Sequence, residues 1–297
     1  AFATALRVKG ESVAQIVGCA RAMRERKVRV QAGEGIVLDT CGTGGDGRGT
    51  FNVSTMAAFV VASCGVRVAK HGNRAASSKC GSADLLEALG VRLELPKEKV
   101  EQILRDVGIA YLHAPSFHPA MKHAAPVRKE LGFRTVFNLL GPLCNPASAN
   151  VQVIGVFDSK WTRPLAEVLR FLGSRAAMIF HGHGGLDELS TTGPNMAIEL
   201  SRGRISRRTI NPSAAGLKKS ALKDLAGGTP QENVQITQEI LAGQKGPRRD
   251  LVLLNAGVAL MVAGCAKSPK EGVVRAAQAI DTGAARKKLD QLIEATR

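Results

Sequence analysis

The sequence is poor in aromatic residues, in paired cysteines and in long apolar runs, and each shortage argues against a class of protein. Aromatic residues make up only 4% of the 297 positions, with one Trp and one Tyr, whereas surfaces that stack nucleic-acid bases are rich in them. The six cysteines stand singly, which argues against a disulfide framework or a zinc site and for reduced thiols. The longest apolar stretches are too short to span a bilayer, so we expect a soluble globular chain.

The start of the chain and its charge set two further limits. The first residues do not resemble a secretory leader, so we expect a cytoplasmic location, or the plastid stroma if a presequence has been removed. Lys and Arg outnumber Asp and Glu by 41 to 25, which gives a net charge of +16. This excess predicts an anionic partner, either a phosphorylated metabolite or a nucleic acid.

Short β-branched runs alternate with helical patterns, which is typical of an α/β fold. We expect strands at 36–40, 66–70, 109–113, 151–157 and 176–180, and helices at 53–64, 82–90, 97–107, 119–131, 161–172, 231–243, 249–265 and 269–280. Residues 1–30 read as two helices, and residues 125–147 as helical without a strand. These two segments are expected to form a small helical lobe. Residues 31–124 and 148–297 are expected to form a larger α/β lobe with a central, mostly parallel sheet flanked by helices.

A glycine-rich stretch, DTCGTGGDGRGTFNVST at 39–55, follows the first expected strand. It satisfies GxGxxG, but a dinucleotide site needs a helix at the glycines and an acid after the next strand, which instead ends in Lys70 and His71. A Walker A motif is absent. Glycine N–H groups and the start of a helix at Asn52, Ser54 and Thr55 can hold a phosphate. Alternatively, Asn52 or Ser54 only caps that helix.

A second polar block, KHGNRAASSKCGSADLLEALG at 70–90, follows the next strand. Loops at the carboxyl ends of parallel strands converge on one crevice, so this block and the glycine loop are expected to line the same pocket. The alternative for Ser82 and Asp84 is a helix cap and a first-turn acid, which we prefer for Asp84.

A third block, HGHGGLDELSTTGP at 181–194, contains the adjacent acids Asp187 and Glu188. A lone acidic pair is usually a solvated turn. Beside an anionic pocket it suits magnesium, which one or two carboxylates hold together with phosphate oxygens. Magnesium prefers oxygen, so His181 and His183 are not expected to be ligands, and His181 is expected to be a buried, hydrogen-bonded histidine.

Six motifs in this order resemble the anthranilate phosphoribosyltransferase family, which has the nucleoside phosphorylase and phosphoribosyltransferase class III fold. They are GTGGD (42–46), NVST (52–55), KHGNRAASS (70–78), GSAD (81–84), HPAMKHAAPVRKELGFRTVFNLLGPLCNPA (118–147) and GLDE (185–188). The resemblance covers most of the chain. It implies transfer of a phosphoribosyl group from 5-phosphoribosyl 1-diphosphate to the amine of anthranilate, in tryptophan biosynthesis, with Mg²⁺ and as a homodimer.

The resemblance also assigns residues to each ligand. For 5-phosphoribosyl 1-diphosphate it implies Gly42, Gly45, Asp46, Thr50, Asn52, Val53, Ser54, Thr55, Lys70, His71, Gly72, Asn73, Arg74, Ser77, Ser78 and Ser82. For anthranilate it implies Gly42, Asn73 and Arg128, and for Mg²⁺ it implies Ser54, Asp187 and Glu188. His71 and His118 either line the aromatic pocket or are structural. No residue is assigned as the proton acceptor, because an aromatic amine already carries its lone pair at neutral pH.

Two other functions are compatible with the fold class. One is a pyrimidine nucleoside phosphorylase, against which Arg128 and RTVFNLLGPLCNP argue. The other is a non-catalytic, nucleic-acid-binding relative. Such a protein has no use for Asp46, Asp187 and Glu188 beside phosphates.

Overall fold

The computed structural model describes residues 1–75 and 78–297, and its centre is one seven-stranded sheet. The strands are β1 (Val37–Gly42), β2 (Arg67–Gly72), β3 (Ile109–His113), β4 (Val151–Gly155), β5 (Ala176–His181), β6 (Asn195–Ser201) and β7 (Arg204–Ile210). Their spatial order is β3-β2-β1-β4-β5-β6-β7. The five strands expected from the sequence are confirmed, and they are mutually parallel. The mostly parallel sheet is therefore confirmed.

Strands β6 and β7 are the part of the sheet that sequence reasoning missed. They form an antiparallel hairpin that extends the sheet beyond β5. Its turn contains Arg202 and Gly203, which both have positive φ, as a tight hairpin turn requires. The last strand, RISRRTI, is an exposed edge whose charges suggest a solvated basic surface rather than a strand.

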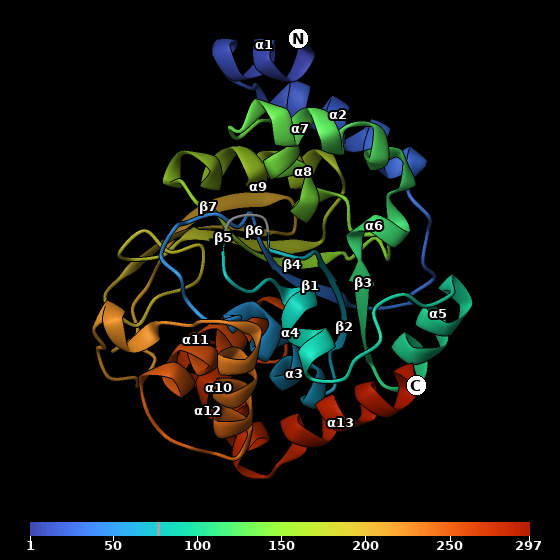
Figure 1. Ribbon diagram of the computed structural model, residues 1–297. Coiled ribbons are helices and arrows are strands. Elements are labelled where there is room, and N and C mark those ends of the chain that lie inside the picture. Colours follow the sequence, from blue (N-terminus) through green and yellow to red (C-terminus); the bar gives the residue numbers. More distant parts are fainter. Residues whose placement is uncertain (76–77) are drawn as a thin grey trace.

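Helices cover both faces of the sheet (Figure 1). They are α1 (Phe2–Lys9), α2 (Val13–Arg26), α3 (Val53–Ser63), α4 (Ser82–Ala88), α5 (Lys97–Asp106), α6 (Ala114–Phe117), α7 (Ala125–Leu131), α8 (Phe137–Leu143), α9 (Thr162–Phe171), α10 (Pro230–Leu241), α11 (Pro247–Val262), α12 (Pro269–Asp281) and α13 (Ala284–Thr296). Short 3-10 helices occur at Pro119–His123, Ser159–Trp161 and Leu222–Leu225. The expected helix at 119–131 is therefore two pieces, and α13 was not expected.

Two hydrophobic clusters hold these layers to the sheet. On one face, α3 and α11 are buried along almost their whole length, because both read as continuous apolar runs. On the other face, α2, α8 and α9 share a second cluster that includes Ile16, Leu139 and Leu165. Figure 1 shows α1, α2, α7 and α8 gathered on this second side. The proposed boundaries of a separate helical lobe stay a prediction.

The chain passes between the helical segments and the sheet at three places, and residues 27–30 contact the other two. The backbone N–H of Val28 donates to the carbonyl of Phe117, and that of Val30 donates to the carbonyl of Pro146. The ammonium of Lys27 donates to the carbonyl of Asn145 at 2.7 Å. These bonds fix how the helical segments sit above the carboxyl ends of the strands.

Two expectations about the whole chain can be compared with the structure. In residues 1–75 and 78–297, no helix combines the length and the apolar character needed to cross a membrane. All six cysteines carry free thiols.

Candidate functional site

Three polar loops meet at the carboxyl ends of the parallel strands. They are residues 43–52 after β1, the described residues 73–75 and 78–81 after β2, and residues 182–194 after β5. Because β2, β1, β4 and β5 lie side by side and run in the same direction, all three loops leave the same edge of the sheet. The convergence expected for the first two loops therefore extends to the loop that carries the acidic pair.

The acidic pair contacts the glycine loop and the start of α3 directly. The backbone N–H of Gly44 donates to Oδ2 of Asp187 at 2.9 Å. The backbone N–H of Ser54 donates to Oε1 of Glu188 at 3.1 Å. The backbone N–H of Asp187 donates to Oδ2 of Asp46 at 3.2 Å. The alternative of a solvated turn is therefore excluded for this pair.

Glycines allow the acidic loop to lie this close to the sheet. A Cβ at Gly155, the last residue of β4, would overlap the backbone oxygen of Asp187, and a Cβ at Gly182 would overlap that of Glu188. A Cβ at Gly42 would lie 2.8 Å from Oδ2 of Asp187. Sequence reasoning missed Gly155 and Gly182, although a glycine that ends a buried strand is a signal of close backbone approach.

The arrangement of carboxylates is electrostatically unfavourable without a cation. Burial and the charge of Asp46 raise the pKa of Asp187, and burial and the charge of Asp187 raise the pKa of Glu188. Among the described residues, no three His, Cys, Asp or Glu side chains form a group that could hold a metal. The two adjacent carboxylates and the hydroxyl of Ser54 nevertheless offer hard oxygen donors. This donor set fits a divalent cation that completes its coordination with ligand oxygens.

Lys70 is buried at the centre of this arrangement. Its Nζ donates to the carbonyl of Thr40 at 2.6 Å and to Oγ of Ser54 at 3.3 Å. Burial lowers the pKa of its ammonium, while the charges of Asp39 and Glu188 oppose that shift. Its two hydrogen bonds therefore hold Nζ of Lys70 beneath the phosphate-suited loop and the acidic pair.

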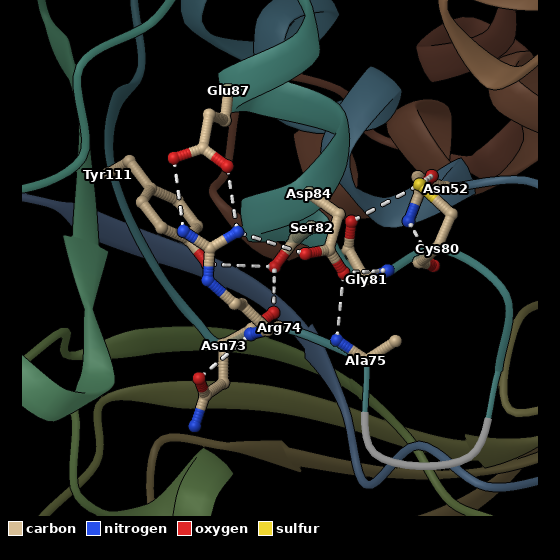
Figure 2. A network of polar contacts seen from close by, with 10 residues as sticks. All are labelled: Asn52, Asn73, Arg74, Ala75, Cys80, Gly81, Ser82, Asp84, Glu87 and Tyr111. Carbon is tan, nitrogen blue, oxygen red and sulfur yellow. Dashed lines mark hydrogen bonds and ion pairs between the residues drawn. The ribbon is translucent and has the colours of Figure 1, made fainter. Parts of the chain in front are cut away.

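The second loop is folded around its own acid (Figure 2). Oδ2 of Asp84 accepts bonds from the backbone N–H groups of Gly81 and Ala75, at 2.8 and 2.9 Å. The preference for Asp84 as a first-turn acid is confirmed, although the capping position is Gly81 and not Ser82. Arg74 points to α4, where it pairs with Asp84 and Glu87 at 3.2 and 2.8 Å.

The remaining predicted residues of this loop lie near one another. Oγ of Ser82 is 3.0 Å from the hydroxyl of Tyr111 and donates to the carbonyl of Asn73 at 3.3 Å. A Cβ at Gly72 would overlap Oγ of Ser82 and crowd the hydroxyl of Tyr111, so a larger residue here would displace these side chains. Ser78 is exposed and donates to the carbonyl of Cys80. Ser77 lies outside the described residues.

Asn52 joins the first two loops instead of capping α3. It is the residue at the capping position, but its side chain makes no capping bond. Its Nδ2 donates to the carbonyl of Cys80 at 3.1 Å, and its Oδ1 accepts a bond of 3.0 Å from Nδ2 of Asn233 in α10. The local alternative for Asn52 is therefore wrong. For Ser54, the hydroxyl receives Lys70 and does not cap the helix.

The other residues predicted in the glycine loop have mixed surroundings. Val53 and Thr55 are buried in the first turn of α3, and Thr50 forms an isolated bridge with Ala226. The carbonyl of Gly45 accepts a hydrogen bond from Arg134, whose guanidinium lies 4.0 Å above the ring of Phe157. Arg134 thus connects the segment between α7 and α8 with the glycine loop.

Two buried histidines lie between the strand ends and the helical segments. The ring centroids of His71 and His118 are 5.0 Å apart. Burial lowers the pKa of His71 to about 3 and that of His118 to about 4, so both rings are neutral. Nε2 of His71 and both ring nitrogens of His118 have no hydrogen-bond partner among the described residues. Oδ1 of Asp39 accepts a hydrogen bond of 3.2 Å from the backbone N–H of His71 and so fixes the backbone at this position.

Arg128 lies on α7, in the helical part of the molecule. Its guanidinium is 5.6 Å from the ring centroid of Phe137, and partial burial lowers the pKa of Arg128. No acidic side chain of the described residues forms an ion pair with it. Nδ1 of His181 donates a hydrogen bond of 2.8 Å to the carbonyl of Val156, so the expected hydrogen bond is confirmed, but the residue is only half-buried, so the expected full burial is wrong.

Comparison with known proteins identifies relatives over the whole chain. Residues 34–286 match the family model "Glycosyl transferase family, a/b domain", and residues 1–27 match "Glycosyl transferase family, helical bundle domain". The chain is 53% identical to an anthranilate phosphoribosyltransferase of Desulfosudis oleivorans, over 100% of this chain and 88% of the relative. It is 52% identical to the enzyme of the same name from Symbiobacterium thermophilum, over 100% and 87%.

Solved structures of proteins with the same name as these relatives superpose closely on this chain. The anthranilate phosphoribosyltransferase of Thermus thermophilus superposes with a TM-score of 0.93 at 46% identity, over 99% of this chain and 88% of that one. The enzyme from Saccharomyces cerevisiae, solved in complex with PRPP and Mg, superposes with a TM-score of 0.92 at 33% identity, over 99% and 84%.

Proposed function

The chain belongs to the anthranilate phosphoribosyltransferase family, and on that premise we propose which of its residues perform each part of the reaction. It transfers the 5-phosphoribosyl group from 5-phosphoribosyl 1-diphosphate to the amine of anthranilate, in tryptophan biosynthesis. The products are N-(5-phosphoribosyl)anthranilate and diphosphate. Identity of 53% over the full chain decides against the nucleoside phosphorylase and the nucleic-acid-binding alternatives.

The phosphoribosyl donor binds along the first two loops. The observation that supports this best is the convergence of the glycine loop, the first turn of α3 and Lys70 on one edge of the sheet. Backbone N–H groups and the positive end of α3 favour the charge of the diphosphate. The residues proposed for this role are Gly42, Gly45, Asp46, Thr50, Asn52, Val53, Ser54, Thr55, Lys70, His71, Gly72, Asn73, Arg74, Ser77, Ser78 and Ser82.

Asn52 and Arg74 contribute differently from the other members of this set. The amide of Asn52 already bonds to Cys80 and Asn233, so its role is to hold the two loops together. Arg74 already pairs with Asp84 and Glu87, so it would have to leave α4 in order to reach a phosphate.

Asp187, Glu188 and the hydroxyl of Ser54 would hold Mg²⁺. When bound there, the ion stabilises negative charge that develops on the departing diphosphate. The structure of the yeast relative contains PRPP and Mg, which supports this assignment. Two half-buried carboxylates that repel each other also support it, because a cation relieves the repulsion.

Anthranilate binds between α7 and the strand ends. The guanidinium of Arg128 can pair with its carboxylate in bidentate fashion, and Asn73 and Gly42 lie at the ends of β2 and β1 below. The neutral, buried rings of His71 and His118 offer flat surfaces to an aromatic ring. With the amine held beside C1 of the ribose, catalysis is mainly positional and electrostatic. No strongly basic side chain is needed.

The proposal is tested by the loss of anthranilate fluorescence after addition of 5-phosphoribosyl 1-diphosphate, with and without Mg²⁺. The double variant Asp187→Asn, Glu188→Gln keeps the shape of both side chains but removes their charges. Turnover that requires Mg²⁺ and drops by about 100-fold or more in this variant supports the metal site. Glu294→Gln, which changes an exposed carboxylate near the C-terminus, serves as the matched control. Full Mg²⁺-dependent turnover in the double variant would refute the assignment.

Three further predictions concern the whole molecule. A homodimer, a cytoplasmic location and the division into a lobe of residues 1–30 and 125–147 and a lobe of residues 31–124 and 148–297 stay predictions. Sedimentation equilibrium tests the first of them.

A further inference from the structure

One polar side chain stands in the middle of the apolar, buried part of α11. Asn255 interrupts the run LVLLNAGVALMV in α11, and only 3% of it is exposed. A buried amide without hydrogen-bond partners destabilises a fold, so the bonds that Asn255 makes explain its presence. Its position is also a signal that the sequence carries and that sequence reasoning missed.

The amide of Asn255 bonds to the backbone of Leu189, the residue directly after Glu188. Its Oδ1 accepts the N–H of Leu189 at 3.0 Å, and its Nδ2 donates to the carbonyl of Leu189 at 2.9 Å. Nδ2 also donates to the carbonyl of Leu251, one turn earlier in α11, at 2.9 Å. The side chain therefore bonds to both backbone groups of Leu189, as a neighbouring strand would. If the amide were rotated so that its oxygen and nitrogen changed places, these bonds would be lost.

The helix that carries Asn255 is itself firmly placed. A Cβ at Gly257 would lie 2.6 Å from the backbone nitrogen of Val273, so the backbones of α11 and α12 lie too close here for any side chain on Gly257. On its other side α11 packs on α3, the helix whose first turn contains Ser54. Asn255 thus connects the acidic loop to a rigid part of the core.

The acidic pair is held on its other side as well. The backbone N–H of Gly182 donates to the carbonyl of Leu186, the residue directly before Asp187, at 2.8 Å. Oδ1 of the fully buried Asn195 accepts the N–H groups of His183 and Ser190, at 3.0 and 2.7 Å. Asp187 and Glu188 therefore lie between two fixed backbone positions, Leu186 and Leu189.

We propose that Asn255 is a positioning residue that holds Asp187 and Glu188 in the geometry needed for Mg²⁺ and 5-phosphoribosyl 1-diphosphate. The inference rests on the metal site of the proposed function. Two adjacent like charges repel each other, so a loop free to relax would move the carboxylates apart and toward water. A fixed backbone at Leu189 prevents this movement before the ligands arrive.

The experiment is a calorimetric titration of 5-phosphoribosyl 1-diphosphate, with and without Mg²⁺, into wild type and Asn255→Leu. Leu branches at the same side-chain atom as Asn but makes no hydrogen bonds. We expect Mg²⁺ to tighten binding in the wild type, and we expect that gain to shrink by about 10- to 100-fold in the variant. Binding without Mg²⁺ is expected to change little. Asn255→Ser, which replaces the amide by a single hydroxyl, should lie between the two and provides the same comparison if Asn255→Leu does not fold.

Asn150→Leu is the matched control for the general cost of losing an amide that bonds to the backbone. Asn150 makes the same kind of bond pair, accepting the N–H of Val37 and donating to the carbonyl of Gly35, at the opposite end of the sheet. Its replacement should lower the unfolding temperature and leave the effect of Mg²⁺ unchanged. An undiminished Mg²⁺ effect in Asn255→Leu or in Asn255→Ser would overturn the inference. A wild type without any Mg²⁺ effect would instead overturn the metal site, and the inference with it.

Discussion

The backbone N–H of Ser54 donates a hydrogen bond of 3.1 Å to Oε1 of Glu188, across 134 residues of sequence. This bond joins the first turn of α3, which faces the phosphoribosyl donor in our proposal, to the acidic pair proposed for Mg²⁺. Both parts of the reaction centre are therefore joined by this hydrogen bond, and a change in either loop is expected to affect the other.

Removing the charges of the acidic pair should not destabilise the protein in the absence of Mg²⁺. Burial and mutual repulsion disfavour the two carboxylates of Asp187 and Glu188, while amides of the same shape carry neither cost. We expect Asp187→Asn with Glu188→Gln to unfold at the same or a higher temperature than wild type, as measured by scanning calorimetry at neutral pH. A clear fall of the unfolding temperature would show that the charges stabilise the loop.

Arg128 should control the affinity for anthranilate and not for the phosphoribosyl donor. Loss of a charged, bidentate contact costs about 1.5–3 kcal/mol, or roughly 10- to 100-fold in KM for anthranilate. We expect this in Arg128→Gln and, to a lesser degree, in Arg128→Lys, because an ammonium cannot form the fork. Steady-state kinetics with each substrate varied in turn measure it. Lys129→Gln, an exposed neighbour on the same helix, should leave both KM values unchanged, and equal changes in both would contradict the assignment.

Gly155 should tolerate no side chain. Because a Cβ there would overlap the backbone oxygen of Asp187, Gly155→Ala must displace the acidic loop, at an expected cost of about 1–3 kcal/mol in unfolding free energy. Gly18→Ala is the matched control, since Gly18 lies on the exposed side of α2 and an added Cβ would meet no atom within 4 Å. It should stabilise the protein by about 0.5–1 kcal/mol. Urea unfolding of both variants measures the difference, and a neutral Gly155→Ala would be inconsistent with the close approach.

His118 should make the stability depend on pH below neutrality. Burial, with a smaller effect of the nearby Lys27, lowers the pKa of His118 to about 4, against about 6.5 in the unfolded chain. Between pH 4 and pH 6.5 the unfolded state binds more protons at His118 than the folded state does. The stability associated with neutral His118 is therefore complete above pH 6.5 and is lost as the pH falls toward 4. For this residue the loss from pH 7.5 to pH 5 is about 2 kcal/mol.

The measurement compares wild type with His118→Gln by urea unfolding at pH 7.5 and pH 5. The difference between the two proteins isolates His118 from opposing groups such as Asp39, whose pKa burial raises to about 6. We expect the variant to lose less stability on acidification. His123→Gln changes an exposed histidine nearby and should retain the wild-type dependence. Identical losses in wild type and His118→Gln would contradict the prediction.

The sequence by itself determined the local features of this protein. Five buried strands, most helices and the three polar loops follow from hydrophobic periodicity and from residues such as the glycines of 42–49, which act within a few positions of each other. The order of six motifs identified the family. The acids Asp187 and Glu188 were also found, because their chemistry is visible without knowing their neighbours.

Only the tertiary structure decided which distant residues meet. The edge hairpin β6–β7, the bridge from Asn52 to Asn233, the close approach at Gly155 and the bonds of Asn255 to Leu189 each depend on pairings between separate elements. The local sequence pattern cannot specify these pairings, because a buried amide or a glycine at the end of a strand has the same local sequence whatever residue packs against it. The packing of α11 and the sheet supplies that partner, and with it the geometry of the acidic pair.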